Sequence, residues 1–410
     1  MWEHLLDRLF ATTIRRGSLT LTLHDGRPRS YGPGGEPSVA VRVSDQNFAA
    51  KLVRNPDLAV GEAYMDGTLE IEGDDLYGFL TLAIINVRGD GFGVWWMRWL
   101  LGLRARLQPL LRANTIGRAR SNVAHHYDLS GALYDLFLDE DRQYSCAYFT
   151  DPEMSLEDAQ LAKKRLIARK LLIEPDCHVL DIGCGWGGMA LTLAKEFGAR
   201  VTGVTLSREQ HRIATERVRA AGLSDRIDIR LQDYRHVPET FDRIVSVGMF
   251  EHVGKKHFST YFNAVHDRLK PDSVALIHTI GRTSPPGPVS PWIDKYIFPG
   301  GYIPSLSEMS RAVEDARLYT TDVEVWRLHY AETLKAWHDR FMARAEKAEA
   351  LYDARFVRMW RYYLIASELT FRLDHQCVFQ VQLAHDQAAV PLTRDYLYAQ
   401  ERTDLRHAAE

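Results

Sequence analysis

Hydrophobic and polar positions follow two different patterns along this chain, and the change falls near residue 160. Beyond it, short apolar runs typical of buried strands alternate with amphipathic stretches of helical period. The pattern predicts helices at 161–173, from a glycine-rich turn through Phe197, and at 208–221, and strands at 178–182, 200–205, 227–231, 243–247 and 274–279. This alternation favours an α/β fold with a mostly parallel sheet. Two later apolar runs, 323–328 and 378–383, are expected to add an antiparallel C-terminal hairpin at its edge.

The first 90 residues have a different character. Strict alternation predicts half-buried strands at 18–23 and 39–43, separated by a proline- and glycine-rich loop at 33–37. Helical spacing predicts helices at 5–10, 47–55 and 76–85. We therefore expect a small mixed α+β domain at residues 1–90, before an α/β domain at residues 121–400.

The stretch between these domains is basic and rich in tryptophan. Residues 91–127 hold six arginines and no acid, and an apolar side carries Trp95, Trp96 and Trp99. We interpret residues 91–120 as a linker helix that contacts an anionic membrane surface. The alternative is a helix whose tryptophans fill the protein's own core. Arginines interrupt the apolar run at 92–107, so no transmembrane segment is expected.

Overall composition narrows the class of protein. Of 410 residues, 26% are charged and the formal net charge is −3, which indicates a globular protein and argues against a nucleic-acid partner. Four scattered cysteines form no C-x-x-C pair, which fits a reducing compartment. The start, MWEHLLDRLF, is not typical of a signal peptide. His125 and His126 have no further ligand at metal spacing, so no metal site is expected.

A glycine-rich loop, Asp181-Ile-Gly-Cys-Gly-Trp-Gly-Gly188, joins a predicted strand to a helix. Its glycines match the dinucleotide fingerprint, but the second strand ends Val204-Thr-Leu-Ser207 without the acid that a nicotinamide site requires. Asp181 instead precedes the first glycine, where a carboxylate suits a cationic ligand and would repel a diphosphate. A tight turn without a ligand is the alternative. This layout resembles class I S-adenosylmethionine (SAM) methyltransferases over residues 160–385.

Seven separated motifs extend the resemblance to almost the whole chain. Their order and spacing are similar to those of cyclopropane-fatty-acyl-phospholipid synthases and the related mycolic acid cyclopropane synthases, of which only the former have the small N-terminal domain. The motifs are His126-Tyr-Asp128, Tyr144-Ser-Cys-Ala-Tyr-Phe149, Gly203-Val-Thr-Leu-Ser207 with Gln210, Leu231-Gln-Asp-Tyr234, Met249-Phe-Glu-His-Val-Gly254, His278-Thr-Ile-Gly281 and His329-Tyr330.

The resemblance implies transfer of a methylene group from SAM to a cis double bond of a membrane phospholipid acyl chain, with bound bicarbonate as the base. It implies that five residues surround the bicarbonate: Cys146, Glu251, His278, Ile280 and Tyr330. Tyr330 would donate its hydroxyl, and Cys146 and Ile280 mainly backbone groups. Glu251 then requires a protonated partner or a protonated bicarbonate, and His278 is the candidate source of compensating charge.

The resemblance also implies a SAM site. Tyr144, Ser145, Gly183 and Gly185 would lie near the methionine end with Asp181. Thr205, Leu206 and Gln210 would meet the ribose, and Gln232 and Asp233 would lie by the adenine.

The expected setting is the cytoplasm, with peripheral association at the inner membrane face. The N-terminal domain is expected to dock lipid or form a homodimer, and the aromatic, proline-rich segment 285–304 is expected to be either a lid or a rigid packed loop. Three alternatives remain open: a fatty-acyl methyltransferase that leaves a methyl or methylene branch, a lipid-binding scaffold with an inactive methyltransferase fold, and a nicotinamide oxidoreductase.

Overall fold

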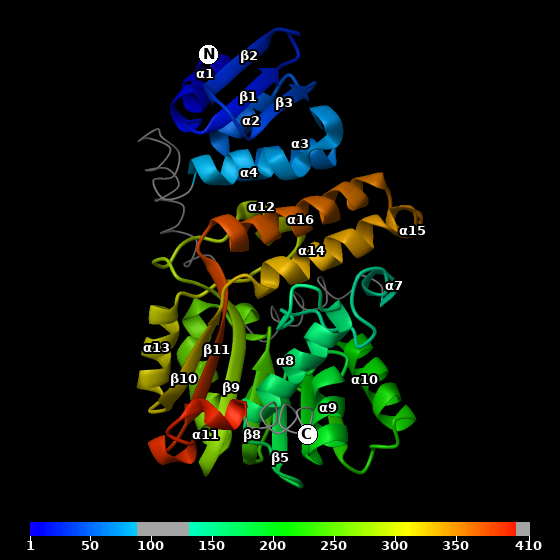
Figure 1. The fold of residues 1–410 in the computed structure, drawn as a ribbon, viewed down its shortest axis with the longest axis vertical. Helices are drawn as coiled ribbons and strands as arrows, with labels where there is room; N and C mark the ends of the chain where they lie inside the picture. Colours follow the sequence, from blue (N-terminus) through cyan, green and yellow to red (C-terminus); the bar gives the residue numbers. More distant parts are fainter. Residues whose placement is uncertain (88–130, 399–410) are drawn as a thin grey trace, which may run out of the picture.

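The computed structural model describes residues 1–87 and 131–398. A four-stranded sheet lies at one end of the molecule and a seven-stranded sheet at the other, with a layer of helices between them (Figure 1). The basic stretch 91–120, the His125-His126 pair and the motif at 126–128 lie outside the described residues. Within the described ranges, no helix combines the length and hydrophobicity needed to cross a membrane.

The N-terminal unit is the expected small α+β unit. Its sheet has the order β2-β1-β3-β4, and β1 and β3 run parallel. The predicted strands are β1 and β3, and the sequence did not predict β2 or β4. The strand β2 was missed because it contains prolines and glycines, which an edge strand tolerates. Its elements are α1 (Trp2–Thr13), β1 (Gly17–Thr22), β2 (Pro28–Gly34), β3 (Ser38–Val43), α2 (Phe48–Arg54), α3 (Pro56–Met65), β4 (Leu69–Ile71) and α4 (Leu76–Val87).

The large sheet confirms the predicted fold class. Its order is β10-β11-β9-β8-β5-β6-β7, and five strands are parallel while β10 and β11 form the antiparallel edge. Its strands are β5 (His178–Ile182), β6 (Arg200–Thr205), β7 (Ile227–Leu231), β8 (Phe241–Val247), β9 (Leu269–Arg282), β10 (Tyr319–Trp326) and β11 (Gln376–Ala384).

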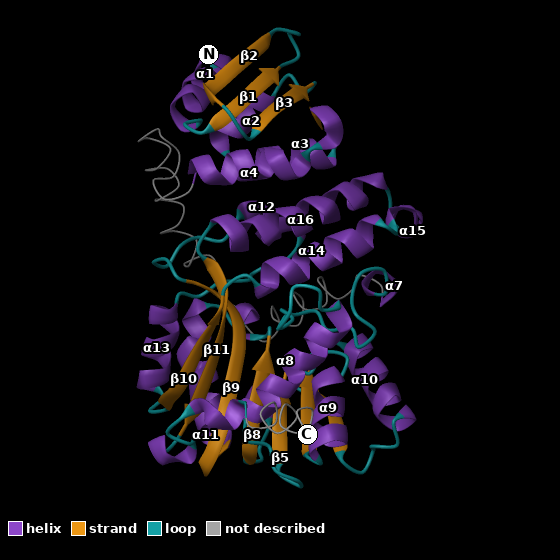
Figure 2. Ribbon diagram, viewed as in Figure 1, coloured by secondary structure: helices purple, strands orange, loops and turns teal. Residues whose placement is uncertain are grey.

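Helices cover both faces of this sheet, which explains why its central strands are continuously apolar (Figure 2). One apolar cluster joins the sheet to α8 (Leu156–Lys170), α9 (Gly188–Phe197) and α10 (Arg208–Ala220). Another joins it to α11 (Phe258–Arg268) and α13 (Leu306–Asp315). The short helix α7 (Gly131–Tyr134) begins the described part of this domain.

The middle layer connects the two sheets. It contains α12 (Pro291–Tyr296), α14 (His329–Met342), α15 (Ala345–Leu351) and α16 (Ala354–Leu373), and α16 contacts both α3 and α4. Trp292 in α12 is 1% exposed and packs against Gly61 of α3 and Tyr362 of α16. Segment 285–304 is therefore the packed alternative, anchored on the N-terminal unit, and not a free loop.

Candidate active site

All ten residues expected at the cofactor line one cavity of about 170 Å³. The cavity lies where the parallel strands end, the usual ligand position in such sheets. Asp181 and Gly183 come from the end of β5, Thr205 from the end of β6 and Gln232 from the end of β7. The other six are Tyr144, Ser145, Gly185, Leu206, Gln210 and Asp233.

Asp181 carries an unsatisfied carboxylate. It is 2% exposed, and its Oδ2 atom is buried without a hydrogen-bond partner among the described residues. Burial raises the pKa of Asp181 to about 7. A cationic ligand at this position would restore the ordinary ionisation of the carboxylate, so the residues present fit the cationic amino and sulfonium groups of SAM.

Polar residues that follow β6 and β7 are partly occupied by one another. Thr205 donates a 2.8 Å hydrogen bond to Oε1 of Gln210, and the Gln232 amide donates to the His236 carbonyl. Arg235 grips the Asp233 carboxylate with two guanidinium nitrogens. Burial opposes ionisation of Asp233, but these bonds prevail and its pKa lies below the usual value. Asp233 therefore stabilises the loop that contains it, through its ion pair with Arg235.

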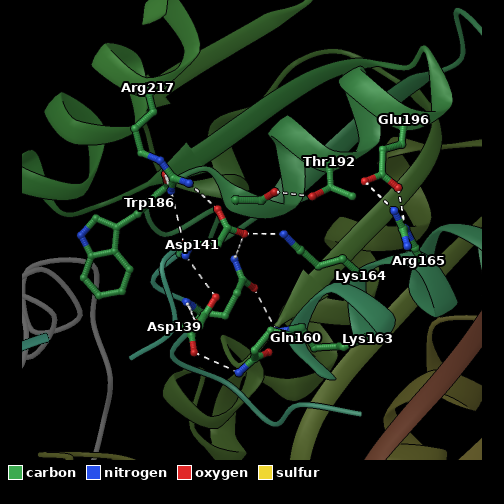
Figure 3. Close-up of polar contacts among 12 residues, drawn as sticks. Asp139, Asp141, Gln160, Lys163, Lys164, Arg165, Trp186, Thr192, Glu196 and Arg217 are labelled. Atoms are coloured by element: carbon green, nitrogen blue, oxygen red, sulfur yellow. Dashed lines mark hydrogen bonds and ion pairs between the residues drawn. The ribbon is translucent and has the colours of Figure 1, made fainter. Parts of the chain in front are cut away.

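A polar network around Asp141 and Lys164, shown in Figure 3, stabilises the loop that leads to Tyr144 and Ser145. Lys163 of α8 is fully buried and donates to Ser145 Oγ at 2.7 Å and to Gln143 Oε1 at 2.9 Å. Gln160 donates to the Ser145 carbonyl. Lys164 and Arg217 both pair with Asp141. Two helices thus fix the loop that forms one wall of the cofactor cavity.

A second, mostly apolar cavity of about 640 Å³ adjoins the first, and Tyr144, Ser145, Gly248 and His252 line both. The structure brings all five expected bicarbonate residues to its wall: Cys146, Glu251, His278, Ile280 and Tyr330. The four shared residues form the boundary between the cavities, and Cys146 and Glu251 are the chain neighbours of Ser145 and His252 at that boundary.

Glu251 is the exceptional group in this set. Its Oε1 accepts a 2.6 Å hydrogen bond from the Ile280 backbone, while Oε2 is buried without a partner among the described residues. Burial raises the pKa of Glu251 to about 7, although the Ile280 bond opposes the shift. Because the Ile280 N–H is committed to Glu251, it is not the free donor that the sequence led us to expect.

His278 differs from the expectation that it balances the charge of Glu251. It is 2% exposed, and Gln380 lies 3.1 Å from its Nδ1. Burial, assisted by the charges of Lys163 and Lys170, lowers its pKa well below the usual value. His278 is therefore neutral and does not balance the charge of Glu251. Protonation of Glu251 itself is the better way for this carboxyl group to accommodate a bound anion.

The remaining two residues, Cys146 and Tyr330, are both buried. Cys146 is 1% exposed and burial raises its thiol pKa, so it is not a thiolate nucleophile. Tyr330, on α14, packs edge-on against Trp337 and beside Phe371.

Sequence reasoning missed three kinds of residue at this site. Lys163 and Gln160 lie on the buried side of α8, and their polar types at apolar-face positions were the available signal. His252 lines both cavities, and burial lowers its pKa to about 4. The apolar lining from the N-terminal unit gave no signal, since it reads as ordinary core.

Comparison with known families assigns both parts of the chain. The sequence profile described as mycolic acid cyclopropane synthetase matches residues 115–381. A second profile, described only as a domain of unknown function, matches residues 1–86.

Individual relatives agree with these matches. The chain is 40% identical to the cyclopropane-fatty-acyl-phospholipid synthase of Escherichia coli over 350 residues, which cover 85% of this chain and 88% of that protein. It is 35% identical to the tuberculostearic acid methyltransferase of Mycobacterium tuberculosis over 395 residues, 93% of this chain and 91% of that protein.

Solved structures give the same relationship for the larger domain. The mycolic acid cyclopropane synthase CmaA1, complexed with S-adenosylhomocysteine (SAH) and CTAB, superposes with a TM-score of 0.61 at 32% identity and covers 64% of this chain and 97% of that one. The cyclopropane synthase MmaA2 of Mycobacterium tuberculosis gives 0.62 at 31% identity and covers 65% and 98%.

Proposed function

Because this chain belongs to the mycolic acid cyclopropane synthetase family of SAM-dependent transferases, we propose that it is a cyclopropane synthase acting on the acyl chains of membrane phospholipids. The single observation that carries the proposal is the junction of the two cavities. A site that fits a cationic methyl donor opens beside an apolar cavity, and the five bicarbonate residues lie on the apolar side of that junction.

The chemistry assigns a task to each part of the site. When bound, SAM supplies a sulfonium methyl to the π electrons of the double bond, and bicarbonate takes a proton from that carbon as the ring closes. Asp181 and the Tyr144–Ser145 segment orient the donor, and the apolar wall excludes water that would quench a carbocation. Positive charge develops close to Glu251, where a bound anion is stabilising.

Glu251 supports the assignment of bicarbonate. A protonated Glu251 can donate from its unpaired Oε2 to an anion while Oε1 keeps its bond to Ile280. Tyr330 lines the same cavity and carries a hydroxyl donor. The test is activity in bicarbonate-free buffer. Turnover should fall and return when bicarbonate is added, and unchanged turnover would contradict this assignment.

A second product is also supported by a relative. The match to a tuberculostearic acid methyltransferase covers nearly the whole chain, so a methyl- or methylene-branched acyl chain is the alternative product. A methylene branch forms when the carbocation loses a proton without ring closure, and a saturated methyl branch additionally requires hydride from a cellular reductant. Ozonolysis of lipids from a host expressing the protein cleaves the methylene-branched product but not a cyclopropane or a saturated methyl branch, and these two differ in mass by two hydrogens.

Membrane access completes the proposal. We assign the basic linker 91–120 to peripheral contact with anionic headgroups at the cytoplasmic membrane face, because each basic residue near such a surface contributes about 1 kcal/mol. A homodimer would add avidity at that surface. Co-sedimentation with anionic vesicles tests the contact, and sedimentation velocity tests the dimer.

A further inference from the structure

The apolar cavity does not end at the catalytic residues. Its far end lies inside the N-terminal unit, where core side chains line it: Leu9, Leu19, Leu21, Val41 and Leu80. These residues are at most 5% exposed and come from α1, β1, β3 and α4. One cavity therefore joins the core of the N-terminal unit to Glu251 and Tyr330, and its volume of about 640 Å³ lies within the usual range of ligand-binding pockets.

The cavity reaches solvent beside two segments that lie close to Arg282. Among the described residues that line it, only Pro288 and Asp374 are exposed. Asp374 lies two residues before Gln376, which pairs with Arg282 at the end of β9, and Pro288 follows Gly287, against which the Arg282 guanidinium packs. The part of the cavity lined by the catalytic residues is its catalytic arm, and the part lined by the N-terminal unit is its N-terminal arm.

Arg282 gives the opening a positive charge. His278, Ile280 and Arg282 alternate along β9 and all line the cavity, so Arg282 stands about 7 Å beyond Ile280 along the strand. Its Nε is buried without a hydrogen-bond partner, and no ion pair joins Arg282 to Asp374 or any other acid within the described residues. A guanidinium with unused donors at the mouth of an apolar cavity suits a phosphate group.

We propose that this cavity binds both acyl chains of a diacyl phospholipid, with the reacting chain in the catalytic arm, the second chain in the N-terminal arm and the phosphate at Arg282. This deepens the proposed function and rests on it. Two apolar arms on either side of one cationic opening match a lipid with two tails and one anionic headgroup. The N-terminal unit is then part of the substrate site.

The first experiment narrows the N-terminal arm. Leu21→Phe adds bulk at a lining position, and Leu23→Phe is the matched control, since Leu23 follows directly after β1 and is also buried but does not line the cavity. Three substrates in detergent micelles share one unsaturated chain: a phosphatidylglycerol with a long saturated second chain, one with a short second chain, and the lysophospholipid.

We expect Leu21→Phe to lower kcat/KM about tenfold for the long-chain lipid. The effect should be smaller for the short second chain and absent for the lysophospholipid, while Leu23→Phe treats all three alike. An equal loss on the lysophospholipid would place the reacting chain in this arm and overturn the proposal. No loss on any lipid in a folded Leu21→Phe protein would also overturn it.

A measurement of lipid binding distinguishes failure of the two-arm site from failure of the proposed reaction. Native mass spectrometry measures retention of the same lipids by the full chain, with SAH present. If the wild type forms no product but Leu21→Phe selectively loses the long-chain lipid, the proposed function fails and the two-arm site stands. If wild type retains the lysophospholipid as well as the diacyl lipid, the two-arm site fails.

The second experiment examines the opening. Arg282→Gln should lower kcat/KM about tenfold for a phosphatidylglycerol but not for the diacylglycerol with the same chains. Arg212→Gln on the exposed side of α10 is the control and should change neither. Equal losses on both lipids would show that Arg282 does not bind the phosphate group.

Discussion

At the scale of single residues, the two buried carboxylates of the site distinguish this protein from a merely well-packed fold. Asp181 and Glu251 each keep one oxygen without a partner among the described residues, and burial raises both pKa values to about 7. Such groups destabilise the free protein and so indicate binding sites. The identity of both residues followed from sequence motifs, but their pKa values depend on the packed surroundings.

Glu251→Gln should reduce turnover by about a hundredfold and leave SAM affinity nearly intact, because the amide can still donate to the bound anion but cannot exchange a proton with it. The wild-type rate should fall as pH rises through about 7, because the protonated donor form of Glu251 is lost. Glutamine keeps a donor but does not titrate, so the residual activity should lack this limb. Calorimetry with SAH and a pH–rate profile check both points. A matching loss of SAH affinity would move Glu251 to the cofactor site.

Asp181→Asn should weaken SAM binding about tenfold and yet stabilise the ligand-free protein. The raised pKa means that the folded state holds a proton that the unfolded state releases, so Asp181 lowers stability as pH rises between about 4 and about 7. At pH 8 the gain from asparagine is on the order of 4 kcal/mol. Thermal melts across this pH range and calorimetry measure the two effects. A less stable asparagine variant at pH 8 would contradict the account.

Lys163→Met should weaken SAM binding about tenfold through the loop it holds, because two bonds to Gln143 and Ser145 are lost. Burial already lowers the pKa of Lys163 to about 7, so removing its charge costs little. Lys347→Met at an exposed position of α15 is the control. Unaltered SAH affinity in a folded Lys163→Met protein would reduce the network to a stability role.

At the scale of elements, three strands of the large sheet, β5, β6 and β7, were predicted to the residue, whereas β9 and β10 begin five and four residues earlier than predicted and parts of the N-terminal sheet were missed. Burial on both faces makes β5 and β6 short, clearly bounded runs of mostly uncharged residues, while the edge strand β7 is recognised by its alternation. The edge strand β2 carries Pro28, Pro33 and three glycines counting its flank, which local propensity assigns to a loop. Its pairing with β1 depends on tertiary context that no short window contains.

Helix α12 makes a testable contact between the two ends of the molecule. Trp292→Ala should lower the free energy of unfolding by about 4 kcal/mol, because it empties the space between Gly61 and Tyr362. Tyr319→Ala, at a residue 50% exposed on the sheet edge, should cost far less. Urea unfolding measures both. Equal losses would show that α12 does not join the two units.

At the scale of the whole molecule, the role of the N-terminal unit changed most between sequence and structure. It carries none of the catalytic motifs, so docking or dimerisation was the natural expectation. The structure adds its core to the wall of the apolar cavity. Sequence could not show this, because a leucine that lines a hollow and a leucine that fills a core have the same pattern along a strand.

Membrane contact is also tested on the whole molecule. Charge reversal at Arg104, Arg106 and Arg112, which lie outside the described residues, should weaken binding to anionic vesicles by about tenfold or more. Reversal at Arg208, Arg219 and Arg327, all exposed on the catalytic domain, is the charge-matched control. Vesicle co-sedimentation at physiological salt measures the difference. Equal weakening in both triple variants would point to net charge and not to the linker.

The most direct test of the central claim is the fate of the transferred carbon. Purified full-length protein is given SAM with a fully deuterated methyl group and a phosphatidylglycerol with one cis double bond, and the acyl product is analysed by mass spectrometry before and after ozonolysis. We predict a product that carries the transferred carbon, has lost one of its deuterium atoms and resists ozonolysis, as a cyclopropane does. A product that ozonolysis cleaves, or one that keeps all the deuterium as a methyl branch, would contradict the account.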